Sequence, residues 1–215
     1  MLDAQILEGM LNLAQLISPD FRPGVSTHGW TGAWVYRVGD IVLICEGHCA
    51  ESRGKRCDKE VLIQLASRLS TRFSDRFVRT VFLGTDIRGR RIYEQPFLKS
   101  WMRQAMDDGL DIENAERTLA DQIIPDSEYQ AFQLSFETAL AELAIARPDL
   151  DISNDTPVKG HETRGISDVM LAPGGGWILS DPVYAKRNPT VKLGHPADSN
   201  AASALEQVLR SNRRA

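Results

Sequence analysis

The chain has 215 residues, a formal net charge of −4 and 42% hydrophobic residues, which suits one domain or two small lobes with a real core. The acidic balance argues against a dedicated nucleic-acid-binding protein, and no apolar run approaches the roughly 20 residues of a membrane span. The N-terminus lacks the basic start and apolar core of a signal peptide. Three cysteines, an odd number, favour a reducing cytoplasm over a disulfide framework.

Strand signals dominate the first half of the chain, after one N-terminal helix. Periodic apolar residues and turn residues predict the following elements up to Leu98: a helix at 2–17, a hairpin at 33–45 turning at Gly39-Asp40, a helix at 57–70, and strands at 78–84 and 90–98.

Helical periodicity dominates the second half. It predicts helices at 100–109, 111–123 and 127–146, a polar loop at 149–166, a hairpin at 168–181, a loop with Pro189 and Pro196, and a short helix at 201–211. The apolar stripe of the longest helix is predicted to be Phe132, Phe136, Leu140, Leu143 and Ala144. Strands clustered before helices indicate an α+β fold. The predicted parts are an N-terminal helix at 1–21, a β-rich part at 22–98 and a helical part at 99–215.

The late stretch "DVMLAPGGGWILSDPV", residues 168–183, carries a resemblance to a known family. Together with the element order, it resembles the protein-kinase-like fold, and in particular the compact kinase-like early proteins of short-tailed phages. The resemblance covers about residues 24–187. It implies two lobes: a β-rich N-lobe with one helix, and a truncated, mostly helical C-lobe that carries the late hairpin. It requires strands 33–45 and 78–98 to share one sheet beside helix 57–70, and the hairpin to lie between the lobes.

The resemblance implies a metal site at the ends of this hairpin. Asp181 matches the metal-binding aspartate of the family, and Asp168 takes the place of an asparagine ligand. Asp168 still offers an oxygen ligand, as Mg²⁺ prefers. The alternative is an ordinary hairpin, in which three glycines only relieve turn strain and Asp181-Pro182 only ends a strand.

The phosphate-binding parts that the resemblance implies are incomplete. Gly29 and Gly32 remain in the glycine-rich stretch "STHGWTGAWV", without an evident third glycine. The expected lysine falls on Ile44, or on Cys45 with a one-residue slip. Its helix partner would be Glu60, which would lack an ion pair unless Lys55 or Arg56 substitutes.

The catalytic loop that the resemblance implies lacks its base. Counting back from Asp168, the aspartate position falls on Thr163, which cannot act as a carboxylate base. His161 lies where such loops often have histidine. Glu162, beside the expected base, is the residue that could rescue an unusual activity.

Three further features carry alternative interpretations. Cys45, His48, Cys49 and Cys57 are zinc-type ligands, but their spacing is not that of a zinc ribbon and favours free thiols. Basic residues in "ESRGKRCDK" and in "RGRR" at 88–91 form either a positive patch or a solvated surface. Trp30, at a glycine-flanked turn, is a candidate interface anchor.

The resemblance and the missing groups together predict a kinase-like protein that is catalytically inactive and requires no cofactor. It would act in the bacterial cytoplasm by binding and inhibiting a host protein through Trp30, Arg53, Lys55 and Arg56. One alternative is an active atypical serine/threonine kinase of phage type that uses Mg and ATP. Another is an α+β protein-binding module unrelated to kinases.

Overall fold

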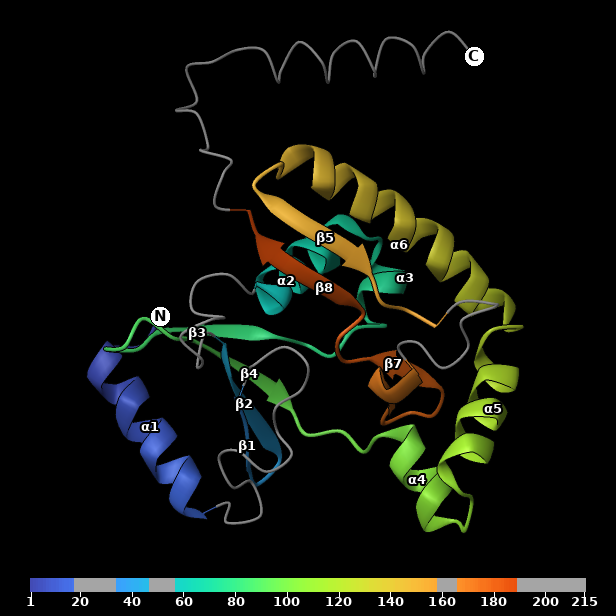
Figure 1. Ribbon diagram of the computed structural model, residues 1–215, viewed down its shortest axis with the longest axis horizontal. Coiled ribbons are helices and arrows are strands. Elements are labelled where there is room, and N and C mark those ends of the chain that lie inside the picture. Colours follow the sequence, from blue (N-terminus) through green and yellow to red (C-terminus); the bar gives the residue numbers. More distant parts are fainter. Residues whose placement is uncertain (18–33, 47–56, 158–165, 189–215) are drawn as a thin grey trace, which may run out of the picture.

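The computed structural model describes residues 1–17, 34–46, 57–157 and 166–188 (Figure 1). These residues form the mixed α+β architecture that the element order predicts. Their helices are α1 (Ala4–Ile17), α2 (Asp58–Arg68), α3 (Thr71–Ser74), α4 (Trp101–Asp107), α5 (Ile112–Ile123), α6 (Ser127–Ala146) and the 3-10 helix η1 (Ile166–Asp168). Their strands are β1 (Trp34–Val38), β2 (Ile41–Glu46), β3 (Val81–Thr85), β4 (Arg91–Pro96), β5 (Leu150–Asn154), β6 (Val169–Leu171), β7 (Trp177–Leu179) and β8 (Val183–Arg187).

The four strands of the first half form one antiparallel sheet in the order β1-β2-β4-β3. The predicted hairpin between β1 and β2 is confirmed, with Gly39 at a φ of +61° in its turn. A left-handed φ favours glycine because it has no Cβ to clash with the backbone. The two predicted strand regions, 33–45 and 78–98, therefore belong to a single sheet.

Helix α1 packs on one face of this sheet and supplies three of the seven buried residues of a small core. The buried residues of that core are Leu7, Leu11, Ala14, Tyr36, Leu43, Cys45 and Ile92. Gly84 of β3 permits the close approach of α1, because a Cβ there would lie 2.8 Å from Leu7 Cδ1. The backbone N–H of Leu2 also donates to the carbonyl of Leu83 at 2.7 Å, so the start of the chain is fastened to β3.

A second and larger core joins α2, α3, α5 and α6 with the late hairpin. Its centre is aromatic: the ring of Phe132 lies 5.5 Å from that of Phe77 and 5.2 Å from that of Trp177. Helix α6 spans the range predicted for it, with Asp126 capping its N-terminus. Its buried stripe includes Ala139, whereas Ala144, which the sequence placed in the stripe, is exposed. The predicted stripe was wrong there because Ala144 follows buried Leu143 directly, and one residue along an α-helix rotates the side chain by about 100°.

Helix α2 packs mainly into this second core, although the sequence assigned it to the β-rich part. Val61, Leu62 and Leu65 are buried there with the residues of α6. The start of the helix is also bonded to β8: Cys57 N–H donates to the Ala185 carbonyl at 3.1 Å, and Ala185 N–H donates to the Asp58 carboxylate. The predicted boundary at residue 98 therefore does not coincide with the boundary between the two cores.

Two segments expected to be loops contain strands. Strand β5 lies within the predicted polar loop 149–166, and β8 follows the hairpin where only a loop was expected. They pair antiparallel, with Ile152 opposite Ala185. Each has only five residues, too few for a clear alternating pattern, and each finds its partner more than thirty residues away. The predicted helix at 201–211 lies outside the described residues.

The predicted late hairpin forms and joins the two halves of the molecule. Strands β6 and β7 pair with Met170 opposite Ile178. On the β6 side Ser100 bridges to Met170, and on the β7 side Phe77 bridges to Leu179. The hairpin thus lies between the segment before β3, which contains Phe77, and the segment after β4, which contains Ser100.

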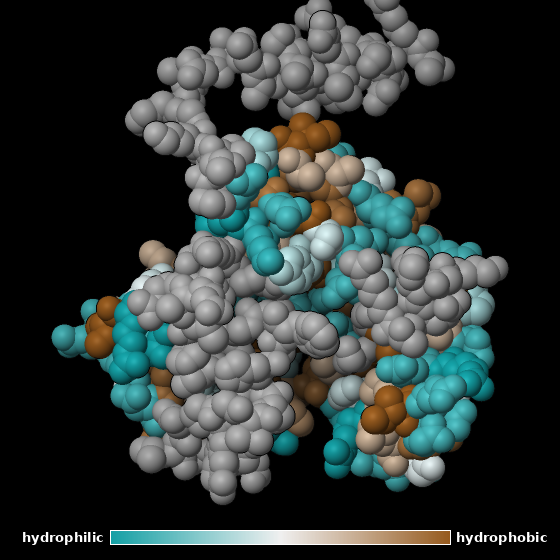
Figure 2. Space-filling model, viewed as in Figure 1, coloured by the Kyte–Doolittle hydropathy of each residue, from teal (hydrophilic) through white to brown (hydrophobic). Residues whose placement is uncertain are grey.

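The surface of the described part offers no sign of a membrane span. No described helix is both long and apolar enough to cross a bilayer. Figure 2 shows polar and apolar residues interspersed over the coloured part of one face, with the apolar ones in small groups.

Candidate functional site

The ends of the late hairpin bring Asp168 and Asp181 together. Asp168 ends the 3-10 helix before β6, and Asp181 follows β7. Ser180 joins the two ends, because its backbone N–H and its hydroxyl donate to the Asp168 carbonyl at 2.9 and 3.1 Å. Both residues that the sequence proposed as metal ligands are therefore at one place.

Lys59, the second residue of α2, completes this group. Its ammonium donates to the Ser180 carbonyl at 3.0 Å and lies 3.5 Å from Asp181 Oδ1. Its side chain is only 8% exposed. Lys59, Asp168, Ser180 and Asp181 are called the Lys59 cluster below. Lys59 was not predicted as a site residue; the signal for it in the sequence was a lysine directly beside Glu60 at the start of a helix.

Glu46 at the end of β2 fixes Lys59 from the other side. Its Oε1 accepts the backbone N–H of Lys59 at 3.0 Å, and the residue is 2% exposed. Glu46 Oε2 has no hydrogen-bond partner among the described residues and lies 3.4 Å from Arg91 Nη2. The sheet thereby positions the lysine without touching its ammonium.

Two carboxyl groups around Lys59, those of Asp168 and Glu46, have pKa values above their ordinary range. Burial raises the pKa of Asp168 to about 7; the negative charge of Asp181 adds to this, and Lys59 opposes it. Burial also raises the pKa of Glu46 to about 7, against the bond from the Lys59 N–H. Asp181 Oδ1 is buried without a hydrogen-bond partner among the described residues. The cluster is thus a desolvated acidic site with one cation.

Glu60, expected as the partner of a phosphate-binding lysine, has a different environment. Its carboxylate accepts from Arg91 at 2.8 Å, from Arg147 at 3.2 Å, and from Arg187. These arginines come from β4, the end of α6 and β8. Glu60 and its three arginines are called the Glu60 cluster below. Since three guanidinium groups already occupy the carboxylate, the cofactor role proposed for Glu60 is not supported by its contacts.

Ile44 stands on β2 where the resemblance expects a lysine. It is 4% exposed and pairs with Val35 and Tyr93 across the sheet. The neighbouring Cys45 packs in the small core under α1, where burial raises the pKa of its thiol to about 12. Neither register supplies a positive charge from this strand.

The cysteines of the described part are free thiols. Cys45 lies in the small core and Cys57 in the large one, so they are not ligands of one ion. Burial raises the pKa of Cys57 to about 12 as well. His48 and Cys49 lie outside the described residues. Within those residues no three metal-ligating side chains gather at one point.

The arginines of the basic run "RGRR" form ion pairs, and Arg88 is exposed whereas Arg90 is buried; residues 51–56, the other part of the predicted patch, lie outside the described residues. Arg90 is 5% exposed and pairs with Asp86 and Glu8. Arg88 pairs with Glu8 at 3.2 Å, and Arg91 pairs with Glu60. The run is basic because it neutralises acids of α1, α2 and its own turn.

The other predicted site residues lie outside the described part of the chain. They are Gly29, Gly32, Trp30, Arg53, Lys55, Arg56, His161, Glu162 and Thr163. Comparisons of the chain with models of known protein families, with curated proteins and with solved structures found no match in any of the three.

Proposed function

We propose that this protein is kinase-like and binds a nucleotide together with a divalent cation at the Lys59 cluster. One observation carries the proposal: the Lys59 ammonium lies 3.5 Å from Asp181 Oδ1, at the hairpin end that also holds Asp168. Lys59 supplies, from the helix, the positive charge that Ile44 does not supply from the strand. The group has the charges that a phosphate–metal site needs.

The arrangement around the cluster supports the proposal. Strands β1 to β4 form the single sheet that the family resemblance requires, and the late hairpin lies between the two halves. Glu46 and Arg91, at the ends of the central strands β2 and β4, connect that sheet to the start of α2. These are shared features of arrangement, and the chemistry comes from the cluster itself.

Two carboxylates suit a magnesium ion that is bound together with phosphate. Mg²⁺ is commonly held by one or two carboxylates, with its other ligands from phosphate oxygens and water. Asp181 offers Oδ1, which has no hydrogen-bond partner in the described part, and Asp168 lies beside it. Bound magnesium would neutralise the phosphate charge. Lys59 would hold a phosphate oxygen, since an ammonium has three donors and one serves Ser180.

A second candidate is the inactive protein that binds a bacterial host protein. The burial of Ile44 in the sheet favours it, because the strand position of the lysine is lost. Thr163 at the base position adds to that argument from the sequence alone. The two candidates differ in a measurable way, because the second does not require nucleotide binding.

Nucleotide binding tests the proposal directly. Mg-ATP is expected to raise the melting temperature of the wild-type protein, because a ligand that binds only the folded state stabilises it. Asp181→Asn and Lys59→Met are expected to abolish the shift. Lys99→Met and Asp107→Asn are matched controls, since that pair is 3.0 Å apart on the surface, with both side chains 42% exposed.

Absence of a shift in the wild-type protein, confirmed by calorimetry with Mg-ATP and Mg-GTP, would show the proposal to be wrong and leave the second candidate. A shift that persists in both cluster variants would place the nucleotide elsewhere. If the shift behaves as expected, transfer of a labelled γ-phosphate to a generic protein acceptor then separates an active kinase from a binding protein.

A further inference from the structure

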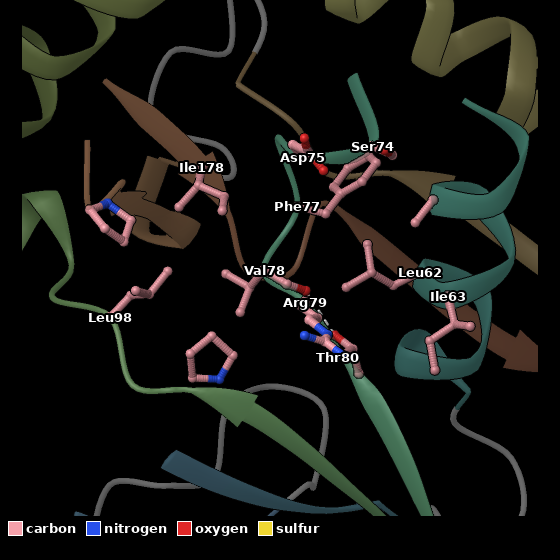
Figure 3. Close-up of a pocket in the computed structure, with 13 residues that line it drawn as sticks. Leu62, Ile63, Ser74, Asp75, Phe77, Val78, Arg79, Thr80, Leu98 and Ile178 are labelled. Carbon is pink, nitrogen blue, oxygen red and sulfur yellow. Dashed lines mark hydrogen bonds between the residues drawn. The ribbon is translucent and has the colours of Figure 1, made fainter. Parts of the chain in front are cut away.

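A cavity of about 410 Å³ lies where the two halves of the molecule join, and no residue of the Lys59 cluster lines it (Figure 3). Four segments form it: the inner side of α2, the stretch 74–80, the connector after β4, and the β6–β7 hairpin. Its volume is at the lower end of the range of about 300–1,000 Å³ that small-molecule sites occupy. It suits one small molecule rather than a folded partner.

The wall of the cavity is mostly apolar. Nine of the thirteen lining residues are apolar, among them Leu62, Phe77, Leu98 and Ile178. Of the uncharged polar residues, Thr80 already donates to the Val78 carbonyl and accepts from Gln95. The Ser74 hydroxyl donates to the Thr71 carbonyl at 3.1 Å. The body of a ligand would therefore have to be apolar.

Two charged residues of the lining have side chains without partners. Neither Arg79 nor Asp75 makes a side-chain hydrogen bond or ion pair among the described residues. Both are exposed. Figure 3 shows Arg79 beside Val78 in the middle of the lining, and Asp75 at its edge near Ser74. A ligand would thus meet a guanidinium in the middle of the lining and a carboxylate at its edge.

We propose that this cavity binds a small amphipathic anion: an apolar body with a single carboxylate that pairs with Arg79. The apolar wall removes the body from water, and a guanidinium matches a carboxylate with two parallel hydrogen bonds. Asp75 disfavours a second negative group at the edge of the cavity. The proposal does not rest on nucleotide binding, because the cavity shares no residue with the Lys59 cluster.

A ligand there would contact both halves at once. Leu62 and Phe77 belong to the large core, whereas Pro96 belongs to the sheet. Ile178 lies in β7, three residues before Asp181. The ligand would therefore hold the sheet against the hairpin that carries the acidic residues.

Calorimetry with four eight-carbon probes tests whether the cavity prefers a ligand with a single carboxylate. The probes are octanoate, 1-octanol, octylamine and the dicarboxylate suberate. Octanoate is expected to bind about fivefold more tightly than 1-octanol, the size of one partly exposed ion pair. Octylamine and suberate are expected to bind more weakly than 1-octanol. Arg79→Ala is expected to remove the advantage of octanoate, and Arg68→Ala, an exposed arginine at the end of α2, is expected to keep it.

Filling the cavity tests the location. Ile63→Trp and Leu98→Trp each place a large side chain in the lining and are expected to abolish binding of all four probes. Their melting temperatures identify whichever variant is folded. The proposal is overturned if octanoate and octylamine bind equally, if none of the probes binds, or if octanoate still binds to a folded, filled variant.

Discussion

Two adjacent residues of α2 stand in environments of opposite composition. Lys59 is one cation among carboxylates, and Glu60 is one anion among three arginines. Both groups lie at the start of the same helix, where it meets the sheet and β8. The difference between them separates a site where acids outnumber the cation from one where cations outnumber the acid.

The Glu60 carboxylate accepts from three guanidinium groups, although Arg91 Nη2 is buried without a hydrogen-bond partner among the described residues. Arg147 pairs with Glu60 and also with Asp149 at 2.8 Å, so each acid has guanidinium donors and each arginine an acid. In the Lys59 cluster one ammonium faces two aspartates, and Asp181 Oδ1 has no hydrogen-bond donor among the described residues. An acid-rich group attracts cations, whereas a carboxylate surrounded by three guanidinium groups joins the elements that carry them.

The largest expected effect comes from Glu46, which holds the Lys59 backbone. Folding raises the pKa of Glu46 from 4.5 to about 7, so the protonated carboxyl group stabilises the folded state. This contribution is fully present below pH 4.5 and is lost as the pH rises through about 7. Glu46→Gln keeps an acceptor for Lys59 N–H but cannot ionise. The variant should match the wild type near pH 4 and exceed it at pH 8 by about 3 kcal/mol in urea unfolding. Equal stability at pH 8 would contradict the buried, ionisable state of Glu46.

The second largest effect on stability is expected from a change at Glu60. Glu60→Gln leaves three arginines around a neutral group, and the free energy of unfolding should fall by about 2 kcal/mol, less than for a fully buried pair because Glu60 is 25% exposed. Urea unfolding measures it. Glu113→Gln is the control: that carboxylate is 84% exposed and pairs only with Arg117 within α5. Its change should stay below about 0.5 kcal/mol, and similar losses in both variants would refute a structural role for Glu60.

The smallest expected effect is on Mn²⁺ binding, and it distinguishes the Lys59 cluster from the Glu60 cluster most directly. Lys59→Met removes a positive charge beside Asp181, so Mn²⁺ without nucleotide should bind about tenfold more tightly. Titration by electron paramagnetic resonance measures the free ion. Glu60→Gln should change Mn²⁺ affinity less than twofold. Tighter Mn²⁺ binding together with weaker Mg-ATP binding in Lys59→Met would show that the lysine serves the phosphate rather than the metal; unchanged Mn²⁺ affinity would contradict the site.

Much of the fold follows from local patterns in the sequence. The bounds of α5 and α6 were predicted closely, because each helix has an aspartate cap and a periodic apolar stripe. The β1–β2 hairpin was predicted from Gly39-Asp40. Strands β5 and β8 were missed because their pairing is long-range and neither has enough residues to show a period. The packing of α2 was also missed, since an apolar stripe does not say which of two cores it enters.

The site was only partly predictable for a similar reason. Asp168 and Asp181 flank a recognisable hairpin, so their proximity follows from its length. Lys59 reaches Asp181 across 122 residues of sequence, and no spacing rule joins them. Glu60 was placed correctly in α2, but its three arginines come from β4, the end of α6 and β8. Charged contacts between elements that are far apart in the sequence depend on how those elements pack. Local sequence patterns do not show this packing.

The hydrogen bonds between Cys57 and Ala185, and between Ala185 and Asp58, make α2 a continuation of the β5–β8 pair. Lys59 and Asp181 therefore both lie close to these bonds along the chain, the lysine one residue after Asp58 and the acid four residues before Ala185. The contact between the cation and the acid thus depends on how α2 is joined to β8, and Glu46 is the contact that the sheet makes with the Lys59 backbone.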